Sequence, residues 1–121
     1  MRIVLVLLAL LNVAWGLFAL ARPGAAGRFV GLSIDAAHGA GELRAVYGAL
    51  VIAFGVVIAA SLRLDGGDQW LRLLAILFAG LAAGRVISLA LDGVVGYTLA
   101  ALLLEAGTAA LLYYGARSVG P

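Results

Sequence analysis

Four long apolar runs, separated by short segments rich in glycine and charged residues, limit this 121-residue chain to a small set of folds. The runs cover residues 3–21, 44–62, 70–91 and 94–114. An α-helix rises about 1.5 Å per residue, so about 20 residues cross the hydrocarbon core of a bilayer. Each run is long enough for one crossing. We therefore predict an all-α membrane protein with four transmembrane helices.

The composition agrees with this class and excludes several functions. Hydrophobic residues make up 65% of the chain and charged residues 12%, whereas a soluble domain is about 25% charged. The absence of cysteine excludes disulfides, thiol catalysis and cysteine-ligated metals. His38 is the single histidine, so we expect no metal site and interpret it as a solvated loop residue. The net charge of +2 comes from scattered arginines, which predicts no nucleic-acid partner.

The first run has two interpretations. Arg2 precedes it, and Ala19-Leu20-Ala21 is typical of a signal-peptide cleavage site. However, the apolar region of a signal peptide has only about 7–15 residues, so we interpret the longer run as a membrane-anchoring helix. Asn12 is its one polar side chain, and we expect it to form a hydrogen bond with another helix.

The connections predict how the helices are arranged. Segment 22–43 is long and begins with a helix-ending Arg-Pro-Gly sequence. Its few apolar residues are expected at the membrane interface, as a short helix or turn, and we interpret it as a connecting loop rather than a functional lid. The next two links are short, which makes the helices they join antiparallel neighbours. We expect a single domain, 1–121, folded as an antiparallel up-down bundle.

The arginine distribution predicts the orientation, because cytoplasmic loops carry an excess of basic residues. With the N-terminus inside, the cytoplasmic side holds more of them. The arginines are Arg2, Arg63, Arg72 and Arg117 inside, Arg22 and Arg28 outside, and Arg44 at the boundary. Both termini are therefore expected in the cytoplasm. Tyr113 and Tyr114, together with Arg117, are expected to form an interfacial belt.

Small residues at helical spacing predict where the helices pack closely, since they allow two backbones to approach. Gly48 and Gly55 lie seven residues apart in the second run. Gly80, Gly84 and Ser88 follow one another in steps of four in the third. We expect both sets to form helix-packing faces.

Two ionisable residues, Arg85 and Glu105, lie inside apolar runs. A charge in hydrocarbon costs at least about 2.5 kcal/mol unless it is paired. Helix rise places Arg85 about 10 Å and Glu105 about 16 Å below the outer surface, a gap that an arginine side chain can span. Glu42 or Tyr47, nearer the surface, could extend the chain of contacts. If the pair does not form, Arg85 is expected to reach Glu42 or Asp92.

Such a cluster has two interpretations, which the sequence leaves open. It is either a buried ion pair that specifies helix register, or a proton relay or binding pocket for a polar headgroup or small solute. The sequence contains no Ser-His-Asp set, phosphate-binding loop or metal motif, so we expect no catalytic residues.

Three motifs extend this picture: Glu42-x-Arg44-Ala45-x-Tyr47-Gly48, then Gly84-Arg85-x-x-Ser88-x-x-x-Asp92-Gly93, then a lone Glu105. With them the chain resembles an uncharacterised family of small bacterial four-helix membrane proteins, known only as a domain of unknown function. The resemblance covers residues 3–115. It implies a multi-pass protein of the bacterial inner membrane. In the orientation that the arginines predict, loop 22–43 is periplasmic and partly interfacial. The resemblance also implies one polar site formed by Glu42, Arg44, Tyr47, Arg85, Asp92 and Glu105. The layout is similar to that of DoxX-like membrane proteins.

The resemblance implies no activity. We expect a small accessory or scaffold protein, not an enzyme, that contacts membrane lipid and assembles with itself or with a larger membrane complex. One alternative is a small transporter or binding protein that holds a polar or protonatable solute between Arg85 and Glu105. Another is an oxidoreductase subunit that binds quinone or lipid near Tyr47 and Arg85. Apart from such a bound lipid or quinone, no cofactor is expected.

Overall fold

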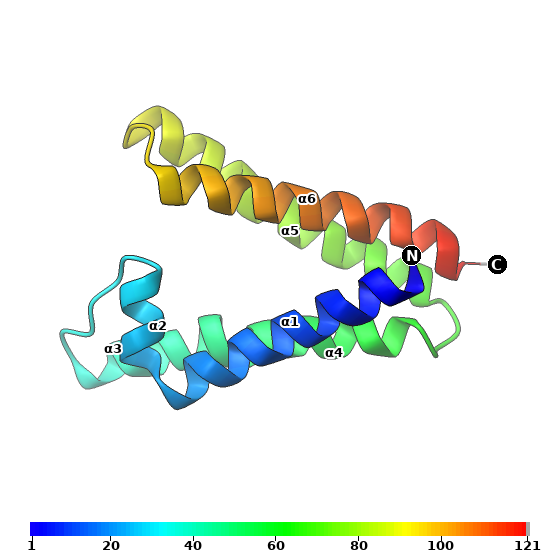
Figure 1. Ribbon diagram of the computed structural model, residues 1–121, viewed down its shortest axis with the longest axis horizontal. Coiled ribbons are helices and arrows are strands. Elements are labelled where there is room, and N and C mark those ends of the chain that lie inside the picture. Colours follow the sequence, from blue (N-terminus) through cyan, green and yellow to red (C-terminus); the bar gives the residue numbers. More distant parts are fainter. Residues whose placement is uncertain (121) are drawn as a thin grey trace. The chain divides into compact units, whose positions relative to one another are not determined.

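The computed structural model describes residues 1–120, and every regular element among them is helical (Figure 1). In chain order the elements are α1 (Arg2–Ala21), α2 (Pro23–Phe29), α3 (Ala37–Glu42), the π-helix η1 (Leu43–Ala49), α4 (Leu50–Ser61), α5 (Gly67–Leu91) and α6 (Gly96–Val119). Because α3, η1 and α4 are continuous, four helices are long and apolar enough to cross a membrane: α1, Ala37–Ser61, α5 and α6. The prediction of four helices that are long and apolar enough to span a membrane is confirmed.

The chain divides into two compact units. The first consists of Met1–Leu5 and the chain from Ser61 onwards, and we call it the hairpin unit; the second is Val6–Ala60. A single bundle and one domain over residues 1–121 stay predictions. Pro121, the last residue of that domain, lies outside the described residues.

The hairpin unit is built from α5 and α6, which pack side by side (Figure 1). The short turn between them includes Gly93, whose φ of 90° favours glycine because it has no Cβ. Buried residues follow a spacing of three and four on each helix, as expected for one apolar face. They are Leu71, Leu74, Ala75, Phe78 and Ala82 on α5, and Thr108, Leu112, Gly115 and Ala116 on α6. The fully buried Leu5 covers Gly115.

Close backbone contacts hold α1 against the second span within the unit Val6–Ala60. A Cβ added to Gly48 would lie 2.9 Å from the Leu20 side chain and 3.3 Å from the Gly16 carbonyl oxygen. A Cβ added to Gly55 would lie 2.7 Å from the Ala9 carbonyl oxygen. Both glycines that the seven-residue spacing singled out therefore lie where a neighbouring helix leaves no room for a side chain.

The glycines of α5 are placed differently. A Cβ added to Gly80 or Gly84 would meet no atom within 4 Å. Each glycine follows a residue of the buried face, Phe78 or Ala82, by two positions, which is about 200° around a helix. The α5–α6 contact therefore uses the larger apolar side chains, which bury more surface than glycine does. The sequence expectation of a close contact through Gly80 and Gly84 is not met inside the hairpin, and a contact through Ser88 stays a prediction.

Segment 22–43 is more helical than the predicted loop. Pro23 begins α2, at the first helical position that suits proline. Phe29, at the end of α2, packs on Trp15 of α1 with ring centroids 5.4 Å apart. His38 is exposed but lies in α3, not in a loop. Asn12 donates its hydrogen bond to the Leu8 carbonyl of its own helix, 2.9 Å away, and not to another helix in this structure.

Candidate functional site

Arg85 of α5 and Glu105 of α6 form a two-pronged ion pair. Arg85 Nη2 donates to Glu105 Oε1 at 2.9 Å, and Arg85 Nε donates to Glu105 Oε2 at 3.1 Å. The side chains are 31% and 12% exposed. Paired hydrogen bonds between a guanidinium and a carboxylate are among the strongest polar contacts in proteins, because both groups are charged and planar. Arg85 and Glu105 therefore form the pair that the sequence analysis offered as one possibility.

The hairpin geometry explains why the two side chains meet. Arg85 lies six residues before the end of α5, and Glu105 lies nine residues after the start of α6. Their Cα atoms therefore differ in depth by roughly 5 Å. Side chains on a helix lean toward its N-terminus. In this antiparallel pair Arg85 leans away from the turn and Glu105 leans toward it, so the two lean toward each other.

Tyr97 and Asp92 lie near the turn end of the same hairpin. The Arg85 guanidinium carbon is 6.0 Å from the Tyr97 ring centroid, within the range of a cation–π contact. Asp92 accepts a hydrogen bond from the Ser88 hydroxyl at 2.7 Å. Asp92 therefore helps to close the end of α5, where its backbone N–H also donates to the Ser88 carbonyl. Sequence reasoning did not single out Tyr97, although it lies eight residues before Glu105, on the same face of α6.

Glu42, Arg44 and Tyr47 belong to the other unit, Val6–Ala60. Arg44 Nε donates to the Leu20 carbonyl oxygen at 3.1 Å. This places a positive charge at the C-terminal end of α1, where it stabilises carbonyls that lack a helical partner. Glu42 is exposed and Tyr47 is partly buried. The structure thus brings Arg85 and Glu105 together, and a single six-residue site that also contains these three residues stays a prediction.

The first sequence motif coincides with the π-helix η1, which sequence reasoning missed. The Leu50 N–H donates to the Ala45 carbonyl, five residues earlier, as a π-helix requires. Each such turn holds more residues than an α-helical turn, so it rotates the residues that follow. Short π-helical insertions are frequent at functional sites. The apolar periodicity of the second run carries no signal for this change.

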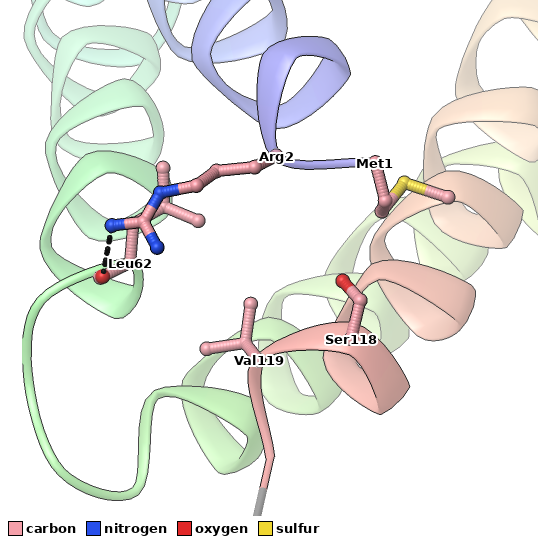
Figure 2. A pocket seen from close by; sticks show the side chains of 5 residues that line it. All are labelled: Met1, Arg2, Leu62, Ser118 and Val119. Carbon is pink, nitrogen blue, oxygen red and sulfur yellow. Dashed lines mark hydrogen bonds between the residues drawn. The ribbon is translucent and has the colours of Figure 1, made fainter.

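A hollow lies at the opposite end of the hairpin unit from the Arg85–Glu105 pair. Its volume is about 310 Å³, and it is lined by Met1, Arg2, Leu62, Ser118 and Val119 (Figure 2). Arg2 Nη2 donates to the Leu62 carbonyl oxygen at 3.0 Å, and the Ser118 hydroxyl donates to the Gly115 carbonyl at 2.7 Å. The first contact joins the start of α1 to the segment that follows α4, whereas the second lies within α6.

Comparison with known proteins places the chain in a family. The family model described as a domain of unknown function, DUF4345, matches residues 1–116. The chain belongs to the DUF4345 family. No curated protein and no solved structure matches it. The resemblance to an uncharacterised family is confirmed, while the individual motifs and the DoxX-like layout stay predictions.

In this DUF4345 chain the Arg85–Glu105 pair has two chemical capacities. It can neutralise two charges inside a membrane, and its partly exposed guanidinium can donate to a further acceptor. Within residues 1–120, no group of three or more His, Cys, Asp or Glu side chains is arranged to hold a metal ion.

Proposed function

We propose that this DUF4345 protein is an accessory or scaffold protein of the bacterial inner membrane, and that Arg85 and Glu105 stabilise its α5–α6 hairpin. The observation that supports this role is the two-pronged ion pair, because each charge finds its main partner within the same hairpin. A pair of this kind specifies register: sliding one helix by a residue would separate the charges in a medium where that is costly. A hairpin with fixed register presents a defined surface to another copy or to a larger membrane complex.

A second candidate function is binding of a polar or protonatable solute, a quinone or a lipid, as a transporter or oxidoreductase subunit would require. The observation that favours it is the partial exposure of the Arg85 side chain next to the Tyr97 ring. An arginine beside an aromatic ring suits a planar or anionic ligand, because the guanidinium donates hydrogen bonds and the ring stacks.

Native mass spectrometry of the purified protein separates the two proposals. The variant carrying both R85M and E105L removes the charges but keeps apolar side chains of similar volume. A scaffold role predicts the same oligomeric state and the same retained small molecules as in the wild type. Loss of a bound quinone, lipid or solute from the double variant, with its fold intact, would favour the second function.

The predicted orientation of the protein in the membrane can be tested by labelling. We expect labels attached at either end of the chain to report the cytoplasm, because the basic residues outside the polar cluster lie mainly on that side. Single cysteines are suitable labels, since the natural chain has none. A cysteine in the turn between α5 and α6, for example Val94→Cys at an exposed position, should instead react with a membrane-impermeant reagent added from the periplasm. Reaction of a terminal cysteine from that side would contradict the proposed orientation.

A further inference from the structure

Two arginines meet at one aromatic ring at the end of the hairpin where α5 begins and α6 ends. The guanidinium carbons of Arg72 and Arg117 lie 5.8 Å and 5.2 Å from the centroid of the Tyr113 ring. Arg117 also lies 5.5 Å from the centroid of Tyr114. The two tyrosine rings pack edge to face, with centroids 5.8 Å apart. We call Arg72, Tyr113, Tyr114 and Arg117 the arginine–tyrosine cluster.

The charge of this cluster is only partly balanced by the protein. Among residues 1–120, Asp68 is the carboxylate that approaches it, and its Oδ2 is 3.7 Å from Arg72 Nε, too far for a good hydrogen bond. The Arg72 side chain is 45% exposed, and Arg117 is exposed as well. Two positive charges therefore lie near one ring, and one carboxylate forms an ion pair with Arg72. An anion would relieve the repulsion that remains between the two arginines.

The cluster also lies near the ends of two helices that are long and apolar enough to cross a membrane, and headgroups lie at the ends of such helices. Arg72 is five residues from the start of α5 and Arg117 is two residues from the end of α6. The next residues toward the middle of α5 include Leu73, Ile76 and Leu77, which are large, apolar and exposed. The arginine and aromatic side chains would therefore lie beside the phosphate of a phospholipid, and the apolar surface beside its acyl chains.

We propose that the arginine–tyrosine cluster binds the phosphate of an anionic phospholipid, with the acyl chains lying along the exposed apolar residues of α5. A planar guanidinium can donate two parallel hydrogen bonds to a phosphate, and two guanidiniums from different helices can hold it from two sides. The ring of Tyr113 keeps both guanidiniums in place through its negative face. In the predicted orientation this end of the hairpin faces the cytoplasmic leaflet.

Lipid titration of the intact protein tests the proposal. We would measure apparent Kd by native mass spectrometry in detergent, for phosphatidylglycerol and, separately, for phosphatidylcholine. An arginine near a membrane surface contributes about fivefold to the affinity for anionic lipid. Arg72→Gln and Arg117→Gln should therefore each weaken phosphatidylglycerol binding about fivefold, and together about thirtyfold. Phosphatidylcholine binding should change little.

Arg63→Gln is the matched control, because Arg63 is an exposed arginine near the same end of α5 but outside the cluster. If Arg63→Gln weakens binding as much as Arg72→Gln, diffuse surface charge explains the affinity and the proposal is overturned. Competition by soluble glycerol phosphate at concentrations comparable to the lipid would show a site for free phosphate instead. If a glutamine variant does not fold, the variants Arg72→Lys and Arg117→Lys replace it in the titration, because they keep the positive charge. Full affinity in both lysine variants would contradict the guanidinium geometry.

Discussion

Replacing Arg85 with methionine, or Glu105 with leucine, should destabilise the protein by roughly 3–5 kcal/mol in a lipid bilayer, because each change leaves the other charge without its partner. Both prongs of the contact join the same two side chains, so either change removes both hydrogen bonds between them. The medium determines the magnitude. An ion pair exposed to water contributes at most about 1 kcal/mol. A large effect of either single variant would therefore indicate that the pair lies in hydrocarbon.

The double variant R85M/E105L should be far more stable than either single variant, because no unpaired charge remains and the apolar side chains fill similar volumes. The measurement is a double-mutant cycle on unfolding free energy in one lipid mixture. A coupling energy of several kcal/mol is expected. Additive effects, with a coupling below about 0.5 kcal/mol, would mean that the two side chains do not depend on each other.

Gly55→Leu should weaken the packing of α1 against α4 by roughly 1–3 kcal/mol. A side chain at this position would place its Cβ 2.7 Å from the Ala9 carbonyl oxygen and 2.8 Å from Val13 Cγ2. One of these neighbours is backbone and cannot rotate away, so the helices must separate. Removing a helical glycine normally favours a helix by up to about 1 kcal/mol, so net destabilisation would show that the steric effect dominates.

Gly84→Leu is the matched control for this experiment, because it makes the same chemical change on a helix where an added Cβ meets no atom within 4 Å. We expect its thermal unfolding temperature in detergent to equal or exceed that of the wild type. A loss of stability as large as that of Gly55→Leu would show that this face of α5 is covered by another part of the chain or by another copy.

Sequence by itself determined the four long helices and limited the possible partners of Arg85, for reasons that hold in any fold. A backbone in hydrocarbon must satisfy its own hydrogen bonds, so four apolar runs of this length have to become four helices. The short turn then makes α5 and α6 neighbours, and the cost of an unpaired charge requires a partner for Arg85. The sequence left Glu105, Glu42 and Asp92 as candidates, and the structure has Glu105 in that place. The helix boundaries differ from the prediction. The second span starts with α3 at Ala37 and not at residue 44, and α6 ends at Val119 and not at residue 114.

Tertiary structure alone decided which faces touch. Gly80 and Gly84 repeat every four residues, as do Phe78 and Ala82, and periodicity cannot rank two faces of one apolar helix. The apolar periodicity of the second run also gave no sign of the π-helix η1. The sequence predicted an interfacial belt of Tyr113, Tyr114 and Arg117, and the structure brings these three side chains into contact. That Arg72 meets the Tyr113 ring was not predictable, because it depends on the rotation of α5 about its own axis, which is determined only when side chains from both helices interlock.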